Sequence, residues 1–206
     1  MNRTLIIIGA GGHGKVVADI AEKSKQWGKI CFLDDNPSIQ YAGRYEVLGV
    51  VADAKKYVGD GGFFVAIGDN SIRQKVQSDF ERQGFAAATL IHPNAVIASD
   101  VEIGSGTVVM AGVVVNSGTK IGKGCIINTS ASVDHDCTIN NYVHISPGAH
   151  LAGNVYVGER NWIGLGSLII NNLILFRDCT IGAGAVVIHN IDESGTYVGL
   201  PARKVN

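Results

Sequence analysis

Residues 97–120 read IASDVE-IGSGTV-VMAGVV-VNSGTK, four consecutive hexads that each begin with Ile or Val. The same spacing places Ile, Val or Leu at every sixth position from Ile91 to Val187, seventeen times in succession. A six-residue period fits neither an α-helix nor an alternating strand. It is typical of short parallel strands coiled so that each points one aliphatic side chain toward a common axis. The repeat therefore predicts a parallel β-solenoid.

The other hexad positions indicate how such a coil is shaped. Three hexads make one turn, so the run predicts about five to six turns and a height of about 25 Å at the usual spacing of parallel strands. The fifth position is mostly small, which lets bulky and small side chains fill a narrow interior together. The second position is often glycine, which we expect at tight corners that need a positive φ or no side chain. These glycines are Gly104, Gly122, Gly158, Gly164 and Gly182.

The four cysteines are Cys31, Cys125, Cys137 and Cys179, and none forms a C-x-x-C pair. Three of them occupy the small fifth position of a hexad. Cys125 and Cys179 share a face but lie three turns apart, roughly 14 Å, which is too far for a disulfide. We therefore expect reduced cysteines packed in the core.

Composition excludes several classes of protein. The 206 residues carry a net charge of −1 with a pI near 6.6, which leaves no basic field for nucleic acid or for an anionic membrane. The chain opens without a signal-like segment, and the apolar run Leu5–Ile8 is too short to cross a bilayer. We therefore expect a cytoplasmic protein with no membrane insertion and no metal site.

The first 85 residues alternate between strand and helix patterns in the order βαβαβα. This order predicts a Rossmann-like half with ligand-binding loops at the carboxyl ends of the strands. We accordingly expect one domain over residues 1–85 and a solenoid with a C-terminal tail over 86–206. The expected elements are strands Leu5–Ile8, Lys29–Leu33 and Phe63–Ile67, helices Lys15–Lys25 and Ser71–Gln83, and a segment around Tyr45–Val51.

A glycine-rich turn follows the first strand and matches G-x-G-x-x-G at Gly9, Gly11 and Gly14, with an acidic pair about twenty residues later. Backbone N–H groups in such a turn can hold a pyrophosphate. NAD is one candidate, but residues 1–85 are about half of a full dinucleotide fold. A nucleotide-sugar has the same pyrophosphate and needs only that half. His13 lies inside the turn, where a helix N-terminus disfavours a cation and a neutral imidazole can face a ligand.

His135 is the strongest catalytic candidate because it stands between Asp134 and Asp136. Two neighbouring carboxylates favour an imidazole that is basic near neutral pH, as a general base requires. The alternative is a surface ion pair. His144 lies half a turn further around the coil and cannot closely meet His135 within one subunit, although the two can converge across a trimer interface. His92, His150 and His189 are expected to be structural.

Motifs spread over the whole chain carry a resemblance to a known family. They are IGAGGHGK at 8–15, FLDD at 32–35, AIGDN at 66–70, NTSASVDHD at 128–136, VHISPGAHLAGN at 143–154, IGAGAVV at 181–187 and VGLPA at 198–202. Together they resemble the hexapeptide-repeat acyltransferases that N-acetylate UDP-4-amino-sugars, the UDP-N-acetylbacillosamine N-acetyltransferases, and their sialic acid O-acetyltransferase relatives. This resemblance implies a left-handed β-helix that trimerises, although parallel crossovers are otherwise nearly always right-handed.

The resemblance also implies roles for individual residues. His135 matches the proposed base and Asp136 the acidic residue that tunes it, with Asp134 as a competitor because successive side chains on a strand diverge. The residues matched to acetyl-CoA binding are His144, Asn128, Gly153, Leu165 and Ala183. Those matched to nucleotide-sugar binding are Gly11, Gly12, His13, Asp34, Asp35 and Gly68. One departure is Phe176, which stands where the family text is usually rich in glycine.

The function expected from these features is transfer of acetyl from acetyl-CoA to the C4 amine of a UDP-linked 4-amino-4,6-dideoxy sugar by a homotrimer. No cysteine has an activated setting, and direct transfer needs only positioning and a base. Alternatives are O-acetylation of sialic acid and N-acetylation of a CDP-, dTDP- or GDP-linked amino-sugar. A noncatalytic nucleotide-sugar sensor is an alternative of another class.

Overall fold

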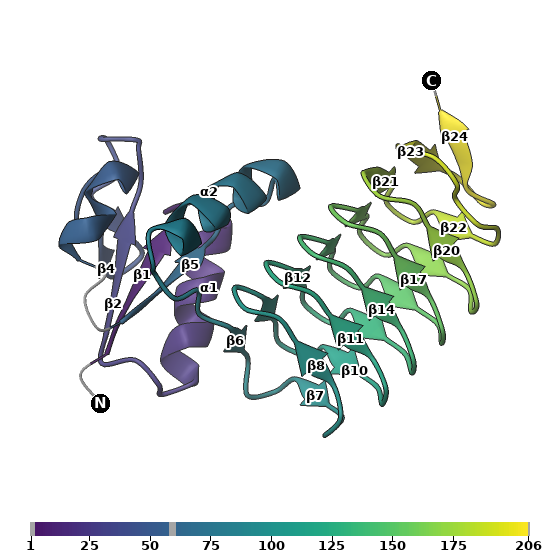
Figure 1. The fold of residues 1–206 in the computed structure, drawn as a ribbon, viewed down its shortest axis with the longest axis horizontal. Helices are drawn as coiled ribbons and strands as arrows, with labels where there is room; N and C mark the ends of the chain where they lie inside the picture. Colours follow the sequence, from purple (N-terminus) through teal and green to yellow (C-terminus); the bar gives the residue numbers. More distant parts are fainter. Residues whose placement is uncertain (1–2, 58–60, 206) are drawn as a thin grey trace. The chain divides into compact units, whose positions relative to one another are not determined.

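The computed structural model describes residues 3–57 and 61–205, which divide between Pro93 and Asn94 into two compact units. The first is an α/β unit and the second is a coil of short strands (Figure 1). The expected fold class, an α/β region followed by a parallel β-helix, is confirmed.

A three-stranded parallel sheet of order β2-β1-β5 forms the centre of the α/β unit. Its middle strand is buried on both faces, since Leu5, Ile6, Ile7 and Ile8 have no exposed surface, which explains the unbroken apolar run. The elements of this unit are β1 (Thr4–Ile8), α1 (Gly12–Lys23), β2 (Lys29–Leu33), β3 (Tyr41–Ala42), β4 (Tyr45–Glu46), η1 (Val51–Lys56), β5 (Gly62–Val65), α2 (Asn70–Arg82) and β6 (Leu90–Ile91).

Two elements of this unit differ from the sequence prediction. Helix α1 begins at Gly12 rather than Lys15, because the end of the glycine turn is already helical. A Cβ on Gly14 would lie 2.1 Å from the carbonyl oxygen of Gly9, so the turn closes only without a side chain there. In the described part of the connection from β2 to β5, the chain forms the β3–β4 hairpin and the 3₁₀ helix η1 instead of an α-helix.

The coil has three faces, each a sheet in which the strands of the repeat, from β7 to β22, run parallel to neighbours eighteen residues away in sequence. At the C-terminal end of the third sheet, β23 pairs in parallel with β21 and β24 pairs antiparallel to β23. The β7 face contains β7 (Val96–Ile97), β10 (Val114–Val115), β13 (Ser132–Val133), β16 (His150–Leu151), β19 (Leu168–Ile169) and β22 (Val186–Val187). The β8 face contains β8 (Glu102–Ile103), β11 (Lys120–Ile121), β14 (Thr138–Ile139), β17 (Tyr156–Val157) and β20 (Ile174–Leu175). The β9 face contains β9 (Val108–Val109), β12 (Ile126–Ile127), β15 (His144–Ile145), β18 (Trp162–Ile163), β21 (Cys179–Ile181), β23 (Gly195–Val198) and β24 (Arg203–Val205).

The repeated aliphatic residue is the inward-pointing second residue of nearly every strand. From Val109 to Val187 these side chains are at most 3% exposed, and they form one continuous core. The small fifth-position residues are buried among them, including Cys125, Cys137 and Cys179, which are free thiols. Burial raises the pKa of Cys137 and raises that of Cys179 to about 11, so both are protonated at neutral pH. The cysteine prediction is confirmed.

Two hexad positions shape the corners, the fourth through its backbone conformation and the second through its lack of a side chain. Every fourth-position residue from Gly106 to Gly184 has a φ between +55° and +74°, and seven of these residues are not glycine. The second-position glycines lack a positive φ. A Cβ on Gly104, Gly122, Gly158, Gly164 or Gly182 would instead lie 2.3 to 2.7 Å from an atom of the following coil or tail. Lack of a side chain, not backbone conformation, therefore explains those glycines.

No helix within residues 3–57 and 61–205 is long and apolar enough to cross a membrane.

Candidate active site

His135 and Asp136 form a hydrogen-bonded pair at the corner between β13 and β14. The ring Nδ1 of His135 lies 2.8 Å from Oδ2 of Asp136, and both side chains are well exposed. Asp136 occupies the left-handed fourth position of its hexad, with φ +60°. On an extended strand these successive side chains would point apart, but the left-handed corner turns them toward one another.

Asp134 has a different partner. Its Oδ1 accepts a hydrogen bond from Asn116 Nδ2 at 2.7 Å and another from the backbone N–H of His135 at 2.9 Å. These two bonds lower the pKa of Asp134. Asp134 therefore supports the main chain of His135, while Asp136 contacts its ring.

The electrostatics of this corner favour a protonatable imidazole. The hydrogen bond that His135 donates to Asp136 raises the pKa of His135, and the negative charges of Asp134 and Asp136 raise it further. A neutral ring that carries its proton on Nδ1, toward Asp136, leaves Nε2 as a basic lone pair. The arrangement can accept a proton from a substrate amine or hydroxyl.

A predominantly apolar groove of about 430 Å³ runs along the β9 face. The ring of His144 stacks on that of Trp162, with centroids 5.6 Å apart and an interplanar angle of 10°. Asn128 Nδ2 lies 3.2 Å from His144 Nε2, and Trp162 Nε1 donates to Ser146 Oγ at 2.9 Å. We call this the β9-face groove; its lining residues are His144, Ser146, Pro147, Trp162, Gly164, Leu165, Thr180, Ile181, Gly182 and Ala183.

The structure thus brings together four of the five residues expected to bind the cofactor, since Asn128 contacts His144 and the groove includes Leu165 and Ala183. The fifth, Gly153, does not line this groove and lies beside the ring of His135. Sequence reasoning missed Trp162. The available signal was a large aromatic residue at the outward-facing sixth position of a hexad, where it is 48% exposed.

In the α/β unit, the acidic pair organises the loops at the carboxyl ends of the strands. Asp34 Oδ2 accepts from the backbone N–H of Ala10 in the glycine turn at 2.7 Å, and Asp35 Oδ1 accepts from that of Val51 at 2.9 Å. Gly11, Gly12 and Gly68 are exposed, and a Cβ on any of them would meet no atom within 4 Å. These loops leave space for a ligand beside their backbone.

His13 has an environment opposite to that of His135. Burial, followed by the positive charge of Arg73, lowers its pKa to about 4, so the imidazole is neutral at physiological pH. Its Nε2 is buried without a hydrogen-bond partner among the described residues. Sequence reasoning missed Arg73, which is fully buried and donates to the carbonyl oxygens of Ile67 and Gly68 at 3.0 Å each.

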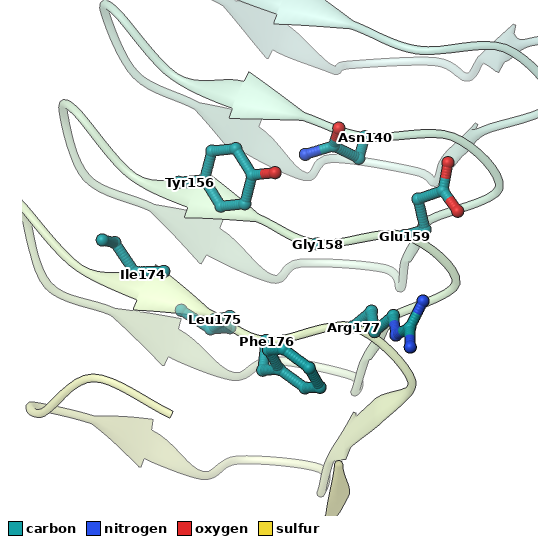
Figure 2. Close-up of a pocket in the computed structure, with 8 residues that line it drawn as sticks. All are labelled: Asn140, Tyr156, Gly158, Glu159, Ile174, Leu175, Phe176 and Arg177. Atoms are coloured by element: carbon teal, nitrogen blue, oxygen red, sulfur yellow. The ribbon is translucent and has the colours of Figure 1, made fainter. Parts of the chain in front are cut away.

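Figure 2 shows a second groove, of about 340 Å³, on the β8 face. Its wall includes Tyr156 from one turn and Phe176 from the next, both partly exposed. The guanidinium of Arg177 lies 5.7 Å from the centre of the Phe176 ring. The departure from the family pattern at Phe176 therefore lies on this groove and not on the β9-face groove.

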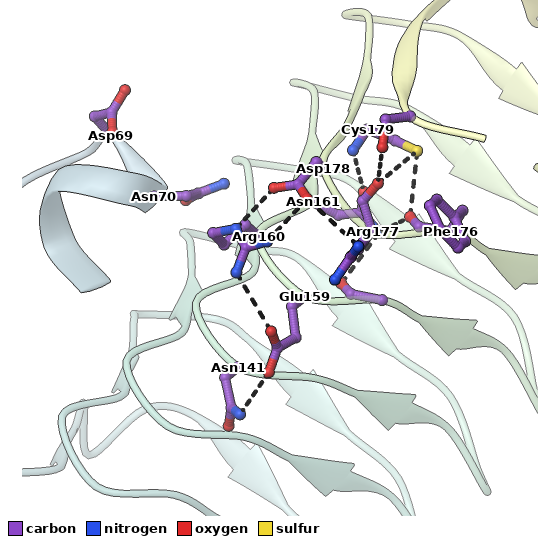
Figure 3. A network of polar contacts seen from close by, with 12 residues as sticks. Asp69, Asn70, Asn141, Glu159, Arg160, Asn161, Phe176, Arg177, Asp178 and Cys179 are labelled. Carbon is purple, nitrogen blue, oxygen red and sulfur yellow. Dashed lines mark hydrogen bonds and ion pairs between the residues drawn. The ribbon is translucent and has the colours of Figure 1, made fainter. Parts of the chain in front are cut away.

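Successive turns are tied together by a ladder of polar side chains at the corner between the β8 and β9 faces (Figure 3). Asn141 Nδ2 donates to Glu159 at 3.0 Å, and Glu159 pairs with Arg160. Arg160 then binds both carboxylate oxygens of Asp178, at 2.7 and 2.8 Å. Arg160 and Asp178 are both left-handed corner residues, and the ladder ties their side chains together across one turn of the coil.

The remaining three histidines do not line the two grooves described above. His150 Nδ1 lies 2.8 Å from Ser132 Oγ, His92 is 6% exposed, and His189 is exposed. In the described part of the chain, no three His, Cys, Asp or Glu side chains are grouped closely enough to hold a metal ion.

Comparison with known proteins gives the class of this chain. Residues 4–80 match the PglD N-terminal domain, and residues 87–117 and 118–153 match the bacterial transferase hexapeptide repeat. GDP-perosamine N-acetyltransferase of Escherichia coli O157:H7 is 32% identical over 86% of this chain and 82% of the relative. The chain therefore belongs to the hexapeptide-repeat acetyltransferases that carry a PglD N-terminal domain.

Two other relatives are informative. UDP-N-acetylbacillosamine N-acetyltransferase of Bacillus subtilis is 36% identical, in a match that covers 52% of this chain and only 50% of that protein. The acetyltransferase domain of PglB from Neisseria gonorrhoeae, solved in complex with acetyl coenzyme A, is 40% identical over the full length of both chains, with a TM-score of 0.96.

Proposed function

We propose that the protein is an acetyl-CoA-dependent N-acetyltransferase that acts on the C4 amine of a nucleotide-linked 4-amino-4,6-dideoxy sugar. The observation that carries this proposal is the His135–Asp136 pair, an exposed imidazole with a raised pKa on a coil that also bears an apolar groove. The relatives act on amino sugars of this kind, and one was solved with acetyl coenzyme A.

His135 is the general base of the proposed reaction. As the sugar nitrogen bonds to the acetyl carbon and the carbon–sulfur bond breaks, Nε2 accepts the proton that the nitrogen loses. Asp136 stabilises the imidazolium, which then returns the proton to the departing thiolate. No covalent acyl-enzyme is needed, and the buried cysteines are protonated and unsuited to nucleophilic attack.

Acetyl-CoA is proposed to occupy the β9-face groove. Apolar walls suit the pantetheine arm, and Asn128 beside His144 supplies polar groups for the thioester end. His135 lies at a corner away from that groove, so the reaction requires His135 of one copy and the groove of another. A homotrimer in the cytoplasm remains our prediction.

The nucleotide-sugar is proposed to bind the glycine turn of the α/β unit. Exposed N–H groups of Gly11 and Gly12 at the start of α1 suit a pyrophosphate, and neutral His13 can face it without adding charge. Asp34, Asp35 and Gly68 border the same strand ends.

Two nucleotides are candidates for the group that carries the amino-sugar. A UDP-linked sugar is our first candidate, from the motifs shared with the bacillosamine enzymes. A GDP-linked perosamine is the second, because the match to the GDP-perosamine enzyme extends over far more of the chain.

A CoA-release assay with UDP-, dTDP- and GDP-linked 4-amino-sugars and free sialic acid tests the proposal. We expect turnover with one nucleotide-linked amine and none with sialic acid. Turnover with sialic acid alone would indicate an O-acetyltransferase. Tight nucleotide-sugar binding without CoA release would indicate a sensor and contradict the proposal.

A further inference from the structure

The His135–Asp136 pair lies between two glycines, each one turn away along the coil. Gly118 lies one turn before Asp136, and Gly153 one turn after His135. A Cβ on Gly118 would be 2.4 Å from Asp136 Oδ1, and a Cβ on Gly153 would be 2.5 Å from His135 Nε2. Both distances are far below any normal contact. The pair therefore occupies the space that side chains at these two positions would fill.

The backbone of the coil does not itself require glycine at either place. Gly153 lacks a positive φ, and other residues at the same third hexad position along this corner are Ser117, Asn171 and His189. Gly118 has φ +74°, but Asn154 and Asn172 adopt a similar φ at the equivalent position of later turns. The two glycines are thus explained by the side chains of the pair and not by the path of the main chain.

The main chain of His135 is anchored from both sides. Its N–H donates to Asp134 Oδ1 at 2.9 Å, and its carbonyl oxygen accepts from the N–H of Asn154 at 2.8 Å. A methyl group added at Gly153 would consequently displace the ring and leave the coil in place. A methyl group at Gly118 would displace the Asp136 carboxylate from the ring in the same way.

We propose that Gly118 and Gly153 are positioning residues for the transfer reaction, which set the orientation of the base and of its carboxylate by leaving room for both. This inference rests on the proposed function of His135. Gly153, expected from the family resemblance to bind acetyl-CoA, acts through the imidazole.

A double-mutant cycle tests the role of Gly153. We expect Gly153→Ala to lower kcat about 10- to 100-fold, the range for misplacing a catalytic group by roughly 1 Å, with smaller changes in the KM of either substrate. In a His135→Ala background the same substitution should change kcat by less than about twofold, because the group it displaces is gone. Equal losses in both backgrounds, or a normal kcat for Gly153→Ala alone, would overturn the proposal.

A second readout does not depend on activity. NMR titration of the His135 ring should show its pKa falling toward the ordinary 6.5 in Gly118→Ala, because the hydrogen bond that the ring donates to Asp136 is the main cause of the raised pKa. An unchanged titration would contradict the role of Gly118. Gly118→Asn repeats the test with a residue that the coil accepts at Asn154 and Asn172.

Two controls separate this proposal from others. Gly148→Ala adds a Cβ at a similar φ of +63° with no atom within 4 Å, so its thermal unfolding reports backbone strain alone. If His135→Ala keeps full turnover, the proposed function of His135 fails. The titration of Gly118→Ala still decides whether the glycines position the pair.

Discussion

The two units of the molecule present the same side chain in opposite electrostatic states. His13 of the α/β unit is mostly buried near the positive charge of Arg73, and its pKa falls to about 4. His135 of the coil is exposed beside two carboxylates, and its pKa is raised. The difference shows that environment decides whether an imidazole serves as a neutral contact or as a base.

Removing the base is expected to have the largest effect. His135→Ala should lower kcat about 10²- to 10⁴-fold, the range for loss of a general base, with little change in the binding of either substrate. The residual rate should rise with pH, because more of the amine is then deprotonated without help. Steady-state kinetics from pH 6 to 9 measures both effects, and wild-type turnover in the variant would place the base elsewhere.

A change in the other unit should separate the two substrates. Gly11→Val should weaken nucleotide-sugar binding by about 10²-fold, because its side chain blocks approach of the pyrophosphate to the backbone. Gly11 has φ −72° with open space around it, so valine fits without disturbing the turn. Calorimetry should find acetyl-CoA affinity nearly intact, and an equal loss for both ligands would refute the division between the units.

The lowered pKa of His13 predicts a loss of stability in acid. The unfolded chain binds a proton near pH 6.5 and the folded chain only near 4, so stability contributed by neutral His13 is full above 6.5 and falls as pH drops toward 4. Between pH 7 and pH 5 the loss should be on the order of 2 kcal/mol. Urea unfolding at pH 7 and pH 5 should show a smaller difference for His13→Asn than for the wild type. Equal differences would mean that His13 is not buried in its neutral form.

Substitutions at the two carboxylates beside His135 should have the smallest effects and should be unequal. Asp136→Asn should lower kcat by about tenfold and shift the rising limb of the pH–rate profile to lower pH, because it replaces the charged acceptor that raises the pKa of His135 with a neutral amide. Asp134→Asn should cost less, because Asp134 supports the backbone. The reverse order would assign the tuning role to Asp134.

Much of the fold could be predicted because the packing of the coil restricts which residue types each hexad position can hold. The inward residue of each strand must be aliphatic and its neighbour at the corner small, so Val109 through Val187 identify the coil. The left-handed corner at the fourth position was not predictable, because Tyr142 and Arg160 occupy it as readily as glycine does.

The left-handed conformation of this corner also decides which side chains of the site meet. Alternation along a strand argued against contact between His135 and Asp136, and only the φ of +60° at Asp136 brings them together. Arg73 drew no prediction because nothing in the helix sequence indicates burial, whereas tertiary packing buries it against the Gly68 loop. Gly153 has no side chain, so its residue type does not indicate in the sequence that it lies beside His135.

The most direct measurement is an NMR titration of the histidine rings in the wild-type protein, with His135 and His13 assigned by the signals lost in His135→Ala and His13→Asn. The account predicts that His135 titrates above 6.5 and His13 near 4. A His135 pKa at or below 6.5 would show that Asp136 does not raise the basicity of the ring, and would contradict the proposed general base. A His13 pKa near 6.5 would contradict the electrostatic difference between the two units.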